Sequence, residues 1–117
     1  MKYVYASRSG KTEKLVQDLG LEGIKINDGS EVIGEDFILF TYTDGHGIVP
    51  PTVVDFLKNN GDNIKGVVAT GNLERHGDTY CFAGDIIAKE YNVPCYGKID
   101  GAGDKDVNAK LKADLGL

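Results

Sequence analysis

Long apolar runs and paired cysteines are both missing from this sequence of 117 residues. No apolar stretch approaches the ~20 residues that a membrane-spanning helix needs. The stretch near the N-terminus, Tyr3-Val4-Tyr5-Ala6, is too short for the ~7–15-residue apolar core of a secretory signal. The two cysteines, Cys81 and Cys95, lack C-x-x-C spacing, so we expect buried reduced thiols instead of a disulfide framework. These absences predict a cytoplasmic protein with no membrane partner.

Positively charged residues are fewer than negatively charged ones in this sequence. Lysine and arginine number 13 against 18 aspartates and glutamates, which gives a net charge of −5 and a pI of about 4.9. Nucleic-acid binding needs a basic patch, and the sequence shows none, so we expect no nucleic-acid partner. An acidic surface suits docking on a positive patch of another protein, and it equally serves solubility. The length suits a single domain, which we place over residues 1–117.

Apolar, β-prone stretches alternate along the chain with stretches of helical spacing. We expect strands at 2–6, 23–27, 37–42, 66–70 and 94–99, helices at 11–19, 80–91 and 107–115, and a further helix that Pro50-Pro51 opens and 59–62 ends. The connection between the second and third strands is turn-rich and has no clear helix. Such alternation predicts an α/β fold, with a parallel sheet covered by helices on both faces.

The most informative stretch follows the first strand and opens the first helix. It consists of Ser7, Arg8, Ser9, Gly10, Lys11 and Thr12. Free N–H groups and the positive end of the helix dipole converge at such a turn, so it suits a phosphate monoester. A Walker A loop would need a glycine at position 5, which is Tyr5 here. An ordinary strand–helix turn capped by a serine is the other alternative.

Three polar, glycine-rich segments leave the expected strands at their carboxyl ends: 7–12, 43–49 and 71–79. In an open α/β sheet, ligands bind at this edge, and the three segments could clasp a flat ring attached to a phosphate. No residue between them resembles a nucleophile paired with a base, so we expect no catalytic side chain.

A metal site at His46 and His76 lacks a spaced third ligand. Asp44 as a phospho-acceptor would need an acidic pair where Ser7-Arg8-Ser9 stands.

The segment 7–12 resembles the flavodoxin phosphate loop, S/T-x-S/T-G-x-T. More narrowly, the whole chain resembles the NrdI family, the flavodoxin-like proteins that serve class Ib ribonucleotide reductase. The further residues that carry this resemblance are Thr41-Tyr42-Thr43, Gly47, Val49-Pro50, Gly66-Val67-Val68-Ala69-Thr70-Gly71-Asn72, Gly77, Ala83-Gly84-Asp85 and Tyr91-Asn92-Val93-Pro94. Each motif is weak alone, whereas their order and spacing over most of the chain are specific.

The resemblance implies a flavodoxin-like three-layer sandwich whose five-stranded parallel sheet has the order 2-1-3-4-5. It also implies FMN as the cofactor, with residues 7–12 at its phosphate. One side of the isoalloxazine would be lined by Thr41, Tyr42, Thr43, Asp44, Gly45, His46 and Gly47. The other side would be closed by Gly71, Asn72, His76, Gly77, Asp78 and Tyr80.

In the family, the reduced flavin meets oxygen and delivers an oxidant to the dimanganese site of the small reductase subunit, where it helps to build a tyrosyl radical. The implied partners are therefore that metal-binding subunit and an electron-donating reductase or thiol protein, and the flavin carries the chemistry. A general flavodoxin-type electron carrier and a non-redox module for a phosphate ligand or a protein partner are the alternatives.

The chain departs from the family at three site positions. Lys11 stands where asparagine is common, and His46 and His76 stand where aromatic residues are usual. A protonated histidine would favour the anionic two-electron reduced flavin by charge attraction. We therefore expect this reduced state to be easier to reach at low pH than in relatives that carry the aromatics.

Overall fold

The computed structural model describes residues 1–44, 47–75 and 77–117. Its strands are β1 (Lys2–Tyr5), β2 (Gly23–Lys25), β3 (Phe37–Tyr42), β4 (Ile64–Gly71) and β5 (Cys95–Asp100), and its α-helices are α1 (Lys11–Asp18), α2 (Pro51–Asn60), α3 (Phe82–Tyr91) and α4 (Lys105–Asp114). Short 3-10 turns lie at Gly61–Asn63 and Gly77–Thr79. All strand pairs are parallel, in the order β2-β1-β3-β4-β5. The predicted fold is therefore confirmed.

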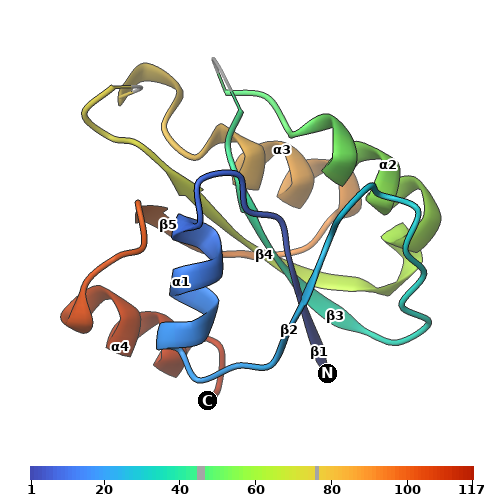
Figure 1. Ribbon diagram of the computed structural model, residues 1–117, viewed down its shortest axis with the longest axis horizontal. Coiled ribbons are helices and arrows are strands. Elements are labelled where there is room, and N and C mark those ends of the chain that lie inside the picture. The colour runs from blue at the N-terminus through green and yellow to red at the C-terminus, as the bar shows by residue number, and fades with distance from the viewer. Residues whose placement is uncertain (45–46, 76) are drawn as a thin grey trace.

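Figure 1 shows helices on both faces of the sheet, and an apolar core lies on each face. Side chains of α2 and α3 pack with Phe37 and Leu39 of β3 on one face. Side chains of α1 and α4 pack with Ile38 and Phe40 on the other. Successive side chains of a strand point to opposite faces, so a strand covered on both sides must be apolar at every position. This explains the continuous apolar run at 37–42.

The observed elements follow the predicted ones, with differences at their ends. The second strand stops at Lys25, two residues before the predicted end, because its only neighbour β1 ends at Tyr5, which pairs with Lys25. The strand expected at 66–70 extends over Ile64–Gly71. None of the described helices is long and apolar enough to cross a membrane.

The connection between β2 and β3 contains no helix, as predicted, and side-chain hydrogen bonds hold it in place. The Glu31 carboxylate accepts N–H groups from Asn27, Asp28 and Gly29 at 2.8–3.3 Å. The side chain of Asn60, which is buried at the end of α2, accepts the N–H of Ile33 at 2.9 Å. Its amide also donates to the carbonyls of Glu31 (2.7 Å) and Phe56 (2.9 Å). These bonds satisfy backbone groups that a helix would otherwise pair.

We expect Asn60→Ala to lower the free energy of unfolding by about 1–3 kcal/mol, because it leaves buried backbone groups without partners. Chemical denaturation measures the change. Asn59→Ala is the control, since Asn59 is exposed and makes one long bond of 3.4 Å to the Gly29 carbonyl. Equal losses in the two variants would contradict the role assigned to Asn60.

A second expectation concerns acid. Burial raises the pKa of the Glu31 carboxyl, but the backbone N–H donors of Asn27, Glu31, Asp28 and Gly29 outweigh it and hold this pKa below its usual value. A carboxyl with a depressed pKa stabilises the fold above its unfolded pKa, and this contribution is lost as the pH falls through the folded pKa. Glu31→Gln should therefore destabilise the protein at pH 7, and its difference from the wild type should shrink towards pH 3. A difference that stays constant over that range would contradict the assignment.

Candidate functional site

A cavity of about 290 Å³ lies at the edge where β1, β3, β4 and β5 end. Its lining residues are Arg8, Ser9, Lys11, Thr12, Tyr42, Thr43, Thr70, Gly71, Asn72, Arg75 and Gly101. They come from the segments 7–12, 43–49 and 71–79, here called the first, second and third loops, and from the strand ends and the turn after β5. Parallel strands bring their carboxyl ends to one edge, so the sheet itself gathers these distant segments.

The first loop turns sharply at Gly10, whose φ of +88° favours glycine over residues with a side chain. The Ser7 hydroxyl oxygen accepts the N–H groups of Gly10 (3.1 Å) and Glu13 (3.4 Å). Ser7 therefore shapes the start of α1 by bonding inside the loop. The space beside Gly10 is open, since a Cβ at this position would meet no atom within 4 Å.

The second loop is joined to the first by Arg8. Its Nη1 donates to Asp44 Oδ1 at 2.8 Å, and its guanidinium carbon lies 5.3 Å from the ring centroid of Tyr42. Both contacts are modest in energy, because the Arg8 side chain is 66% exposed. The second loop also lies against the start of α3, since a Cβ on Gly47 would come 2.9 Å from Thr79 Cβ and 3.0 Å from Phe82 Cδ2.

Thr12, Thr43 and Thr70 are among the residues that line the cavity. Thr12 Oγ1 lies 2.9 Å from Thr70 Oγ1, and both residues are buried. The Thr43 N–H donates to the Thr70 carbonyl at 3.0 Å, which extends the β3–β4 pairing by one residue. Thr43 Oγ1 is buried and has no hydrogen-bond partner within the described residues. Buried hydroxyls usually have a hydrogen-bond partner, and this one belongs to a residue that lines the cavity.

The third loop is tied to the end of β5. Its Leu73 N–H donates to Asp100 Oδ1 at 3.1 Å, and the Gly71 carbonyl accepts the N–H of Gly101 at 2.9 Å. Within the loop, Asn72 Oδ1 accepts the N–H of Arg75 at 2.9 Å. These bonds hold Asn72 and Arg75 at the cavity.

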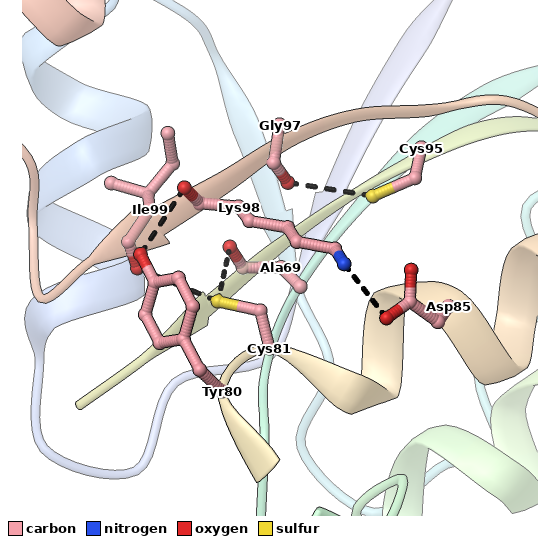
Figure 2. Close-up of polar contacts among 8 residues, drawn as sticks. All are labelled: Ala69, Tyr80, Cys81, Asp85, Cys95, Gly97, Lys98 and Ile99. Carbon is pink, nitrogen blue, oxygen red and sulfur yellow. Dashed lines mark hydrogen bonds and ion pairs between the residues drawn. The ribbon is translucent and has the colours of Figure 1, made fainter. Parts of the chain in front are cut away.

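Figure 2 shows how the chain is anchored between the third loop and α3. The Tyr80 hydroxyl donates to the Lys98 carbonyl at 3.2 Å, so this side chain points to β5. The Cys81 thiol lies 3.5 Å from the Ala69 carbonyl and 3.8 Å from that of Ile99, between β4 and β5. A side chain at Gly71 would be a tight fit, since a Cβ would lie 3.2 Å from both the N and the Sγ of Cys81.

Burial keeps the groups behind the cavity neutral. It raises the pKa of the Cys81 thiol to about 11, although hydrogen bonds partly counteract it. Burial likewise raises the pKa of the Tyr80 hydroxyl, and the nearby Cys81 adds to the shift. A thiol with so high a pKa is protonated at neutral pH and is a poor nucleophile. Neither group is therefore activated as a nucleophile at neutral pH.

The structure brings together much of the predicted site. Predicted residues that line the cavity are Arg8, Ser9, Lys11, Thr12, Tyr42, Thr43, Gly71 and Asn72. Ser7, Gly10, Asp44, Gly47, Gly77 and Asp78 belong to the same three loops but are not among the lining residues. Tyr80 follows the third loop and its side chain bonds to β5, whereas Thr41 is buried in β3. Gly45, His46 and His76 lie outside the described residues. The pH dependence that the two histidines predict therefore stays a prediction.

Sequence reasoning missed three lining residues: Thr70, Arg75 and Gly101. Each had a signal in the sequence. Thr70 ends a predicted strand, Arg75 lies in a predicted site segment, and Gly101 lies in the glycine-rich turn after the last strand. Within residues 1–44, 47–75 and 77–117, no cluster of three histidines, cysteines or carboxylates could hold a metal ion.

Both the sequence and the structure of this chain are similar to those of known proteins. Residues 3–112 match a family model described as NrdI Flavodoxin like. The chain is 38% identical to the protein NrdI of Ruegeria sp. (strain TM1040), over 95% of this chain and 84% of that protein. It is 32% identical to the SPbeta prophage-derived protein NrdI of Bacillus subtilis (strain 168), over 97% and 89%. A structure of Fusobacterium nucleatum flavodoxin bound to flavin mononucleotide superposes with a TM-score of 0.69 at 17% identity, over 99% of this chain and 96% of that one.

The buried, protonated state of Cys81 predicts its reactivity. At pH 8 a disulfide reagent should modify Cys95 slowly and leave Cys81 untouched, because the thiolate is the reactive form and Cys81 is fully buried. Mass spectrometry of digested protein locates the label. Unfolding in denaturant should expose both thiols, which serves as the control. Rapid labelling of Cys81 in the folded protein would contradict this environment.

Proposed function

Because the chain belongs to the family of NrdI flavodoxin-like proteins, we propose that it binds FMN in the cavity and serves a class Ib ribonucleotide reductase. The observation that carries the proposal is the meeting of the first, second and third loops around one cavity, with hydroxyls and cations at the phosphate-loop side. A phosphate monoester suits that side, and a flat ring suits the space between the other two loops.

The residues present fit such a ligand. Ser9, Lys11 and the first turn of α1 would hold the phosphate, with Ser7 and Gly10 setting the shape of the loop. Thr43 carries the buried hydroxyl that is left without a partner in the described structure, and it would bond a polar atom of the ligand. Tyr42, held under the Arg8 guanidinium, would line one side of the ring, and Gly71 and Asn72 would lie on the other.

When bound, FMN would supply the redox chemistry, reducing dioxygen to the oxidant used in assembling the dimanganese–tyrosyl radical cofactor of the small reductase subunit. The chain's own residues would bind and orient the cofactor. The neighbouring thiol and phenol stay protonated, so they would not compete as nucleophiles or bases. The partners proposed are this subunit and an electron-donating reductase or thiol protein.

The direct test is reconstitution. Purified protein incubated with FMN and then desalted should retain a yellow flavin spectrum. After reduction, mixing with the manganese-loaded small subunit and oxygen should produce a tyrosyl radical, detected by electron paramagnetic resonance. Retained FMN without radical formation would instead favour a general electron carrier. A colourless protein would favour the non-redox module.

A pair of glycine variants tests the location of the site. Gly10 and Gly20 have φ values of +88° and +75°, and a Cβ at either would meet no atom within 4 Å. Alanine therefore brings a similar strain of about 1–2 kcal/mol at both positions. Only Gly10→Ala should weaken FMN binding, by about tenfold, because the phosphate loop must relax. Titration of flavin fluorescence gives the two affinities, and equal affinities would place the phosphate elsewhere.

A further inference from the structure

The three cations that line the cavity differ in what they contact. Arg8 is paired with Asp44 at 2.8 Å, so its charge is largely neutralised by the second loop. Lys11 and Arg75 form no salt bridge with any residue in the described part of the chain. In a protein of net charge −5, these two side chains therefore bring to the cavity positive charge that no ion pair among the described residues engages.

The neutral donors of the first loop are in part already engaged. The Ser7 oxygen accepts the N–H groups of Gly10 and Glu13, which removes two backbone donors from the set available to a ligand. The hydroxyls of Thr12 and Thr70 bond each other, and this uses one of their two protons. Fewer uncharged groups thus remain to bind an anion than the sequence of the loop suggests, so charge carries more of the attraction.

Lys11 and Arg75 reach the cavity from separate segments. Lys11 is the first residue of α1, and its side chain extends over the turn after β5, where a Cβ on Gly101 would lie 3.6 Å from Lys11 Cδ and 3.9 Å from Nζ. Arg75 lies in the third loop, in a turn held by Asn72 and, through Leu73, by Asp100. An anion between them would also meet the positive end of the α1 dipole.

We propose that Lys11 and Arg75 are specificity-determining residues that select a phosphate dianion by charge, so that this site binds FMN in preference to uncharged riboflavin. The inference deepens the proposed function and rests on it. Because both side chains are exposed, salt screens their attraction, and the preference should fall as ionic strength rises.

The test is fluorescence titration of the full-length protein with FMN and with riboflavin, each at low and at high salt. Lys11→Asn and Arg75→Gln should each weaken FMN binding by about tenfold at low salt, and they should leave riboflavin affinity unchanged. Lys11→Arg and Arg75→Lys keep the charge and should restore most of the affinity. Lys14→Gln is the matched control, since Lys14 lies on the same helix, pairs with Asp18 at 2.6 Å and does not line the cavity.

The outcomes separate the two proposals. If the wild-type protein binds no flavin, the proposed function itself fails. If the wild type binds FMN but the neutral variants bind it equally well, or lose FMN and riboflavin affinity in parallel, the charge-based selection is wrong. A loss of FMN affinity in Lys14→Gln as large as in Lys11→Asn would show a general effect of net charge and would also overturn it. Circular dichroism of each variant confirms that the fold is intact.

Discussion

The pairing of β3 with β4 is the interaction on which the rest of the molecule depends. These two strands lie at the centre of the sheet and are largely buried on both faces. After a register shift between Phe37 and Ile38, they stay in register up to Tyr42 and Thr70. One further bond, from the Thr43 N–H to the Thr70 carbonyl, carries the pairing into the cavity. It places the ends of both strands, and hence the second and third loops, at a set distance from each other. Helices on both faces then bury the apolar surface of the strands. The removal of this surface from water is the main contribution to the stability of such a core.

Much of the fold could be predicted because its signals are local. The run 37–42 is apolar at every position, and the glycines and prolines mark the ends of its neighbours, so the strands and their carboxyl-edge loops follow from the sequence. The site was harder, because side-chain direction inside a loop depends on contacts distant in sequence. Tyr80 turns to the carbonyl of Lys98, and the Ser7 oxygen accepts bonds from its own loop. Arg75 reaches the cavity only because Asn72 and Asp100 hold its turn.

Charge is distributed unevenly over the molecule. The chain is acidic overall, yet three cationic side chains, Arg8, Lys11 and Arg75, line the cavity, and within the described residues only Arg8 among them forms an ion pair, with Asp44. Such a local excess of positive charge attracts anions towards the site although the net charge repels them. The acidic balance of the whole chain suits contact with a basic partner.

The environment of Cys81 has a consequence for durability. A protein proposed to generate an oxidant exposes its own side chains to that oxidant at every cycle. Thiolates and methionine sulfur are among the groups that such species damage first. Here the thiol nearest the cavity is buried and kept protonated, and the only methionine of the sequence is Met1, at the chain terminus. The chain therefore places few easily oxidised sulfur groups near the site, which would protect it from self-inactivation.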